Sequence, residues 1–525
     1  MASPTPGVRS MQSEPHPVVS RSEGLWVAVL TAVFGLWLVL WAIVVPAFQA
    51  PDEPAHLDAA VHVATGSGWP APGTLHVSNA VQAAQREQVA GDSSTWSTVS
   101  ELLAAHPGDS TTVDQMTQHP PTAYVVDAVV LRVLHYGSLR WDHALVALRL
   151  VDALLVTPLA LLAWASVRRV TRSPLAGLMG ALALFATPQL ASIGASVTND
   201  ALTFLLGGVV VWLATRLLTG DLRRRTLVWL GVALGLLVWT KGTGLPAVPF
   251  VAVVALVAGA GVVPLRRRVL RAAVALGVAA VIGAWWWLRN LWLFRTLQPD
   301  GYAAIRPDRP FPDGQGPSVW HFLDVSWGTL ARTFWGSPGQ RAQVSIGDLL
   351  TAVLTLVALV VLVGWAFRRG RTRRTAWTLA VFPALLLLLQ TASSAKAYLD
   401  TTEVAGTQGR YLFPALLCLV VLSAVAWRRL PLPGRGTAVL PRVLAVALPA
   451  IGLWGLAVAA GWFWNAASGP LSAASIARYE SWGPVPFAVV AVVAVLVAVG
   501  LTGGVLRVWV TPTRSTPTEV SSPTP

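Results

Sequence analysis

Apolar runs long enough to cross a bilayer recur along this 525-residue chain. The first of them, LWVAVLTAVFGLWLVLWAIVVPAF (25–48), contains no charged residue, and a membrane's hydrocarbon core requires about 20 apolar residues in a helix. Charged residues make up only 12% of the chain, about half the share that is usual in soluble domains. The sequence therefore predicts an all-α, polytopic integral membrane protein.

Arginine clusters separate the apolar runs and determine the predicted topology. The clusters are RRVTR (168–172), RRR (223–225), RRRVLR (266–271), RRGRTRR (368–374) and RRLPLPGR (428–435). An excess of Arg and Lys marks cytoplasmic loops, so we place every cluster on that side of the cell membrane. This arrangement predicts both termini in the cytoplasm and about 12 spans, near 25–46, 143–166, 174–193, 200–218, 226–241, 244–262, 270–289, 347–366, 376–393, 411–427, 438–462 and 485–505. It also accounts for the net charge of +14 without a nucleic-acid partner.

The predicted multi-pass membrane domain covers 25–505 and has two long outer loops, about 47–142 and 290–346. The cytoplasmic ends, 1–24 and 506–525, are rich in Pro, Ser and Thr and are expected to be disordered. Within the first outer loop, TAYVVDAVVLRVLHY (122–136) is too short and too charged to be a span, so we predict an interfacial or re-entrant helix. Long loops in compact proteins are usually functional, so function is expected on the outer face.

The motif PDEPAH follows the first span directly and allows three interpretations. Pro54 suits the first turn of a helix, which Asp52 or Glu53 would cap. Asp52, His56 and His62 could instead hold a metal, although their spacing matches no familiar ligand pattern. In the third interpretation one carboxylate is a general base for an acceptor hydroxyl, a role compatible with the cap.

Three cations are predicted at the outer side, opposite the arginine clusters. Lys241 is one of two lysines and lies in VWTKGTG, Arg289 follows WWWL, and Arg410 precedes Tyr411 in GTQGRYLFP. A cation at membrane depth is costly and by default functional, and this set could bind a lipid-linked phosphate. The alternative for the arginines is that they reach to the interface as anchors.

Two polar motifs have competing local explanations. His119 in QHPPTAY is a polar loop residue or a ligand of phosphate or sugar hydroxyls, because its charge changes near physiological pH. Thr198 and Asn199, ahead of a span, are expected to be helix caps. The chain contains no P-loop, no dinucleotide-binding glycine motif, no HExxH and no GxSxG.

Taken in order, several short motifs resemble a known family. PDEPAH after the first span, HPP before a short helix, NDAL opening a span, RN after an aromatic cluster, FWG in a long outer loop and GRYLFP opening a late span are similar to the bacterial membrane family called domain of unknown function 2142, over roughly 25–465. That family is similar in layout to the GT-C glycosyltransferases, which include protein mannosyltransferases and aminoarabinose transferases.

The resemblance implies a GT-C-like fold with interfacial helices in the first outer loop. It implies that Asp52 is the catalytic carboxylate, with Glu53 as its neighbour. It suggests a role near the donor phosphate for His119 and makes Lys241 and Arg410 the other phosphate candidates. Together with the residues chosen from the sequence itself, the predicted substrate- and phosphate-binding set is His56, His119, Lys241, Arg289, Arg410 and Tyr411. His119 stands where aminoarabinose transferases carry a Lys before proline.

The function favoured by these implications is transfer of a sugar from a polyprenyl-phosphate donor to a cell-envelope acceptor on the outer face. The acceptor would be a glycan, a lipid or a protein, and membrane lipids are the remaining partners. No cofactor is required, and a divalent metal stays open without being favoured. The alternatives are a transporter or flippase for a lipid-linked envelope precursor, or a noncatalytic protein of envelope assembly.

Overall fold

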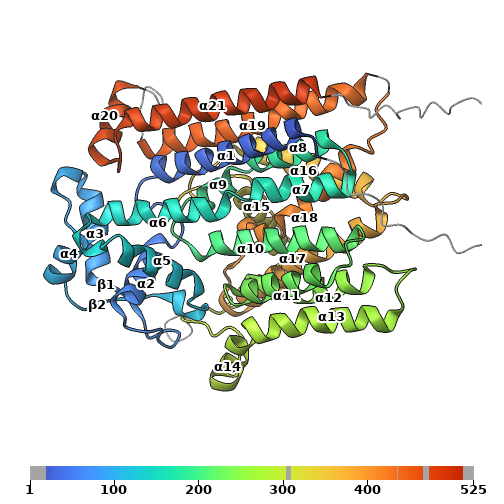
Figure 1. Ribbon diagram of the computed structural model, residues 1–525. Coiled ribbons are helices and arrows are strands. Elements are labelled where there is room, and N and C mark those ends of the chain that lie inside the picture. Colours follow the sequence, from blue (N-terminus) through green and yellow to red (C-terminus); the bar gives the residue numbers. More distant parts are fainter. Residues whose placement is uncertain (1–18, 303–308, 434, 465–471, 512–525) are drawn as a thin grey trace, which may run out of the picture.

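Helices dominate the computed structural model, which describes residues 19–302, 309–433, 435–464 and 472–511. Most of them run along one common direction and form a bundle, and the chain between α1 and α6 forms a cap at one end (Figure 1). The predicted all-α class and the multi-pass architecture are confirmed. The predicted disordered ends, 1–24 and 506–525, lie mostly outside the described residues. The first helix already begins at Arg21 and the last extends to Val510.

Nine helical segments within the described ranges are long and apolar enough to cross a membrane. They are α1 (Arg21–Val44), α6 with α7 (Trp141–Val156 and Leu159–Thr171), α10 (Asn199–Leu218), α13 with α14 (Leu265–Ala279 and Trp285–Phe294), α16 (Asp348–Val361, continued to Ala366), α17 (Arg373–Thr401), η8 with α18 (Gly409–Ala415 and Leu416–Trp427), α19 (Gly436–Trp464) and α21 (Phe487–Val510). A tenth candidate is a broken pair, α8 (Pro174–Leu182) and α9 (Pro188–Gly194), which is bent by 72°.

All twelve predicted spans coincide with helical segments, but the predicted number exceeds what helix length supports. The ranges 226–241 and 244–262 contain only α11 (Arg224–Val238) and, after the short η5 (Gly242–Gly244), α12 (Ala247–Val257). A 15-residue helix such as α11 is about 22 Å long, short of a hydrocarbon core of about 30 Å. The break between these two helices leaves Lys241 in a buried, non-helical turn, which becomes part of the site described below.

The arginine clusters meet at one end of the bundle. Arg428 donates to the carbonyl of Thr171 at 2.8 Å, and Arg429 donates to that of Ala366 at 2.9 Å. Figure 1 shows that α1 begins and α21 ends at this same end, while the first loop covers the opposite end. Because the start of α1 and the end of α21 lie on the same side, the chain between them must cross the membrane an even number of times. The twelve predicted spans meet this condition.

The first loop folds into a small unit of its own. It contains α2 (Glu53–Thr65), α3 (Asn79–Ala90), α4 (Val99–Ala105), α5 (Thr122–Val133) and a two-stranded antiparallel pair, β1 (His76–Ser78) with β2 (Asp109–Val113). Trp141, at the start of α6, packs against Phe48 and Trp96 with ring centroids 5.2 and 4.6 Å apart, and these rings anchor the unit to the bundle. The short helix predicted within 122–136 is α5, which has 12 residues and cannot span.

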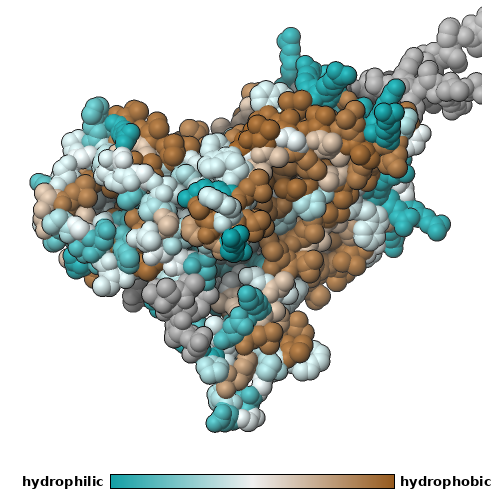
Figure 2. All heavy atoms as spheres, turned by 90° about the horizontal axis from the view of Figure 1, so that it is seen from below, coloured by the Kyte–Doolittle hydropathy of each residue, from teal (hydrophilic) through white to brown (hydrophobic). Residues whose placement is uncertain are grey.

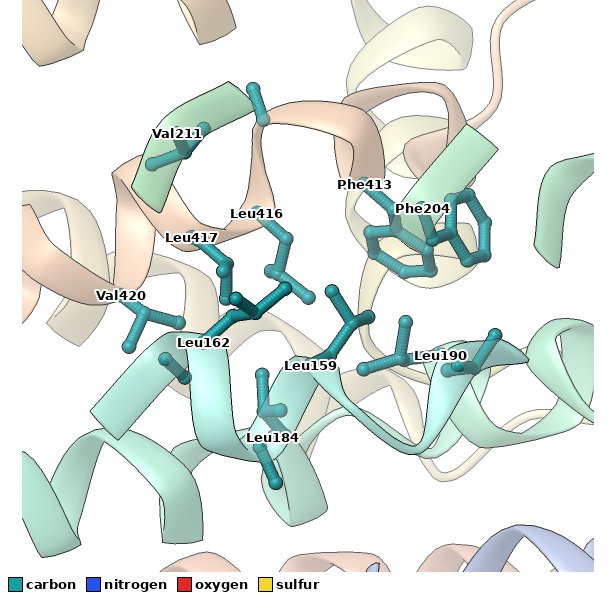
Figure 3. Close-up of a cluster of buried hydrophobic side chains, with 14 of the residues drawn as sticks. Leu159, Leu162, Leu184, Leu190, Phe204, Val211, Phe413, Leu416, Leu417 and Val420 are labelled. Carbon is teal, nitrogen blue, oxygen red and sulfur yellow. The ribbon is translucent and has the colours of Figure 1, made fainter. Parts of the chain in front are cut away.

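Apolar packing holds the bundle together and a second apolar surface faces outward. Leu159 and Leu162 of α7 pack with Phe204 of α10 and with Phe413 and Leu416 of the η8–α18 segment (Figure 3). Large apolar side chains also cover the outside, and Figure 2 shows them as a broad belt between hydrophilic ends. The second long loop, about 290–346, contains α15 (Val319–Trp335), and α20 (Ala473–Trp482) precedes the last span.

Candidate active site

Asp52 occupies an unusual backbone conformation at the turn between α1 and α2. Its φ of 59° is left-handed, a region that Asp tolerates better than most residues. Pro54 lies in the first turn of α2, as predicted, and the Asp52 carbonyl accepts from the backbone N–H of His56 at 3.0 Å. The Asp52 carboxylate makes no capping hydrogen bond, contrary to the predicted cap. With 41% of its side chain exposed, it turns instead toward Arg410.

Four charged side chains from distant parts of the chain meet beside this turn. The Nη2 of Arg410 donates to Oδ2 of Asp52 at 3.4 Å, and its Nε lies 4.0 Å from Oδ2 of Asp200. Lys241 donates from Nζ to Oδ1 of Asp200 at 2.6 Å. Asp200, Lys241 and Arg410 are all at least nine-tenths buried. Two carboxylates thus balance two cations at the boundary between the bundle and the first loop.

The elements that carry these charges explain why they meet. Asp200 is in the first turn of α10, Arg410 is in η8, which packs on α10, and Lys241 follows the end of α11. The predicted cap of α10 is confirmed, because the hydroxyl of Thr198 accepts from the backbone N–H of Asp200 at 3.2 Å. The hydroxyl of Thr122, in α5, donates to the carbonyl of Trp239 and so ties the first loop to the break before Lys241.

Unused hydrogen-bond donors remain in the cluster. Nε of Arg410 is buried and makes no hydrogen bond within the described ranges. The ammonium of Lys241 has three donors, and its only hydrogen bond found in the described part of the chain is the one to Asp200. A buried charge with spare donors is a suitable partner for an anion such as a phosphate. Tyr411 lies beside the guanidinium of Arg410, 5.6 Å from the ring centroid to Cζ.

His56 and His119 line the same cluster as neutral imidazoles. Burial, followed by the nearby positive charge of Lys241, lowers the pKa of His119 to about 3 and that of His56 well below 6.5. Nδ1 of His56 is 2.9 Å from the hydroxyl of Tyr124, and its Nε2 is 3.5 Å from that of Thr198. Nδ1 of His119 is buried and has no hydrogen-bond partner among the described residues. Both rings can therefore offer hydrogen bonds but no charge near neutral pH.

Glu53 has a different environment from its neighbour Asp52. It is fully buried and accepts from Nε and Nη2 of Arg149 at 2.7 and 2.6 Å, and from the backbone N–H of Phe48 at 2.9 Å and of Val197 at 3.2 Å. Arg149 also donates to the carbonyls of Ala42, Val45 and Pro46. This ion pair ties the end of α1 to α6 and leaves the Glu53 carboxylate no face toward the charge cluster.

Arg289 is the one predicted cation that the structure does not bring to the cluster. It lies on α14, where its Cζ is 5.1 Å from the ring centroid of Trp286 and 5.9 Å from that of Phe294. Asp200, Tyr124 and Arg149 were not predicted as site residues. Asp200 carried a usable signal, because an acid at a span end can neutralise a lone lysine at membrane depth.

The metal interpretation of PDEPAH finds no support in the geometry. His56 contacts Tyr124 and Thr198, whereas His62 lies near Asp109 of β2. In the parts of the chain that the structure describes, no group of three or more His, Cys, Asp or Glu side chains is placed to hold a metal ion.

Two solved structures align with most of this chain at low sequence identity. ArnT from Cupriavidus metallidurans, crystallised with undecaprenyl phosphate, is 19% identical, with a TM-score of 0.47 over 93% of this chain and 74% of that one. The oligosaccharyltransferase AglB from Archaeoglobus fulgidus, in complex with an inhibitory peptide and a dolichol-phosphate, is 14% identical, with a TM-score of 0.39 over 93% of this chain and 56% of that one. At these values the likeness establishes neither a common fold nor a common activity.

The family comparison is more specific than the structural one. No curated protein matches the chain. The model of the family described as "Predicted membrane protein (DUF2142)" matches residues 34–419, which include Asp52, His119, Asp200, Lys241 and Arg410. Because this match covers well over half of the sequence, the chain belongs to the DUF2142 family of membrane proteins.

Proposed function

We propose that this protein is a GT-C-type glycosyltransferase that moves a sugar from a polyprenyl-phosphate donor to an envelope acceptor on the outer face of the cell membrane. The observation that carries the proposal is the pairing of the half-exposed Asp52 carboxylate with the buried guanidinium of Arg410. A carboxylate that is open to water thereby lies beside buried cations with spare hydrogen-bond donors, which we propose receive the phosphate of the donor.

In the proposed reaction Asp52 takes the proton of an acceptor hydroxyl, and the acceptor oxygen forms a bond to the anomeric carbon. The bond from that carbon to the phosphate oxygen breaks, and its electron pair leaves with the lipid phosphate. Arg410 and Lys241 stabilise this anion, since preorganised charges at a buried site act strongly on developing charge. Attack by the acceptor itself makes inversion at the anomeric carbon the expected outcome.

The remaining predicted residues have supporting roles in this proposal. His119 and His56 give neutral hydrogen bonds to the donor, and Tyr411 packs against Arg410. We propose that Glu53 positions Asp52 through its ion pair with Arg149 and does not itself meet substrate. Asp200 holds Lys241 and Arg410 in place until the phosphate arrives.

The test compares surface glycans of a deletion strain complemented with wild type, Asp52→Asn or Asp313→Asn. Asn also tolerates the left-handed backbone of residue 52, so the variant is expected to insert normally. We expect Asp52→Asn to lose transfer activity about 10²–10⁴-fold, the usual effect of removing a general base, and to resemble the deletion strain. Asp313 is exposed in the loop before α15, and its variant is expected to retain the glycan.

Two outcomes would contradict the proposal. One is an Asp52→Asn strain with full glycan content, and the other is a deletion strain whose surface glycans equal those of wild type. Glu53→Gln tests the positioning role of Glu53 separately from the catalytic role of Asp52. The substitution leaves Arg149 as a buried charge without its counter-ion. Its main expected effect is therefore a lower amount of inserted protein, whereas Asp52→Asn is expected at wild-type amounts.

A further inference from the structure

A groove of about 510 Å³ runs between α10 and α11. Unlike the charge cluster, it is lined mostly by apolar side chains. Leu206, Val209 and Leu213 form one wall, and Val232, Ala233 and Leu236 form the other. Trp229 lies at its rim and is 62% exposed, so the groove opens to the surface of the bundle. The two helices lie side by side in Figure 1, and the volume is within the usual range for small-molecule sites.

Positive charge marks one end of the groove. Arg216, in the last turn of α10, and Arg225, in the first turn of α11, both line it. Asp221 neutralises Arg216, which donates to Oδ2 of Asp221 from Nε at 2.9 Å. Arg225 is exposed and has no ion pair among the described residues. The arginine end of the groove therefore keeps an uncompensated cation beside an apolar channel.

The length of the groove matches one leaflet of a bilayer. Arg216 lies ten residues after Leu206, which corresponds to about 15 Å along a helix. A hydrocarbon core of about 30 Å gives the same length for each leaflet. Trp212, whose ring centroid is 5.0 Å from Cζ of Arg216, and Trp229 lie near the charged end, where aromatic residues meet lipid head groups.

We propose that this groove binds one acyl chain of an anionic glycerophospholipid from the leaflet at the arginine-rich end, with the lipid phosphate on Arg225. The polyprenyl donor is a poorer occupant, because its phosphate belongs with Lys241 and Arg410 beyond the other end of the groove. The groove and its arginines do not depend on the proposed glycosyltransferase activity, and only the preference for this lipid over the polyprenyl donor rests on it.

The test uses the purified full-length protein in nanodiscs that contain phosphatidylglycerol with a photoactivatable group in its acyl chain. After irradiation, mass spectrometry is expected to find the label on the groove walls of α10 and α11. Val232→Phe fills the groove and is expected to reduce that label about fivefold or more. Val228→Phe is the matched control, because Val228 is on the same helix, is 40% exposed and does not line the groove.

A second variant and its control test the contact between the lipid phosphate and Arg225. Arg225→Gln is expected to remove the preference for phosphatidylglycerol over an equivalent phosphatidylcholine probe, whereas Arg224→Gln, just outside the groove, is expected to keep it. If Val232→Phe does not give a monodisperse protein, Val209→Phe on the opposite wall provides the same test. Equal labelling of wild type and the groove-filling variant would overturn the proposal. So would preferential labelling of the groove by a photoactivatable polyprenyl phosphate.

Discussion

At the residue scale, the first loop contains a buried acid that is not part of the charge cluster. Asp114 accepts from the backbone N–H of Met116 at 2.8 Å through Oδ1, while its Oδ2 is buried and makes no hydrogen bond in the described ranges. Burial raises the pKa of this carboxyl from 3.8 to about 8. The folded protein therefore keeps this proton at neutral pH, where the unfolded chain has lost it.

The sign of the pH dependence follows from that difference. Between pH 3.8 and about 8 the folded state binds one more proton at Asp114 than the unfolded state, so this group's contribution to stability falls as pH rises. Asp114→Asn is neutral throughout and is expected to raise the melting temperature of the detergent-purified protein at pH 8 by a few degrees. The gain is expected to shrink toward pH 4.

A melting series across this pH range tests the prediction. Asp313→Asn is the control, because its exposed carboxylate has no buried environment to lose. A gain for Asp114→Asn that is equal at pH 4 and pH 8 would mean that the effect is not linked to the proton on residue 114.

Two neighbouring acids show the limit of sequence reasoning at this scale. The sequence places Asp52 and Glu53 together after the first span and treats them as one candidate pair. Their environments differ because Glu53 meets Arg149, 96 residues later, and this contact has no local signal. The predicted cap at Thr198 was likewise correct. It gave no indication that the next acid, Asp200, pairs with Lys241, because that ion pair also depends on a contact between distant residues.

At the element scale, the site depends on a close approach between α10 and the segment that carries Arg410. A Cβ added at Gly207 would lie 2.3 Å from the backbone carbonyl oxygen of Pro414, in η8. Backbone atoms cannot move aside as a flexible side chain would. The absence of a side chain at Gly207 therefore allows Arg410 to come within 4.0 Å of Asp200.

Gly207→Ala is expected to push η8 away from α10 and to cost about 1–3 kcal/mol of stability, the usual effect of overpacking. A lower melting temperature in detergent would register it. Gly277→Ala in α13 is the matched control, because an added Cβ there meets nothing within 4 Å. A Gly207→Ala protein as stable as that control would show that the two segments can separate without loss.

Helical segments were predictable from the sequence to the extent that apolar length determines them. Runs of about 20 apolar residues gave the long spans, because a helix is the cheapest way to satisfy backbone groups in lipid. The predicted spans 226–241 and 244–262 place a break just after Lys241, where the structure also interrupts the helix. The bend of 72° between α8 and α9 was not predicted, because the sequence indicates one continuous span over 174–193. Pro188 begins α9 at this bend, and proline interrupts a helix in a way that mean hydropathy along the chain does not record. The ion pair of Lys241 with Asp200 depends on a contact between distant segments, which hydropathy does not record either.

At the scale of the whole molecule, the charge distribution predicts which end of the bundle faces the cytoplasm. The arginine clusters share one end, through contacts such as those from Arg428 to Thr171 and from Arg374 to the carbonyl of Ala260. The first loop, with Asp52, is at the other end (Figure 1). Since arginine-rich loops are retained in the cytoplasm, we expect the first loop and the charge cluster to face outward.

Single cysteines can test this orientation, because the one native cysteine, Cys418, is fully buried and gives little background. His106→Cys, at an exposed position in the first loop, is expected to react with a membrane-impermeant maleimide in intact cells. Arg224→Cys, at the arginine end, is expected to react only after the cells are permeabilised. The reverse pattern would place the carboxylate of Asp52 on the cytoplasmic side and would exclude an acceptor at the outer face.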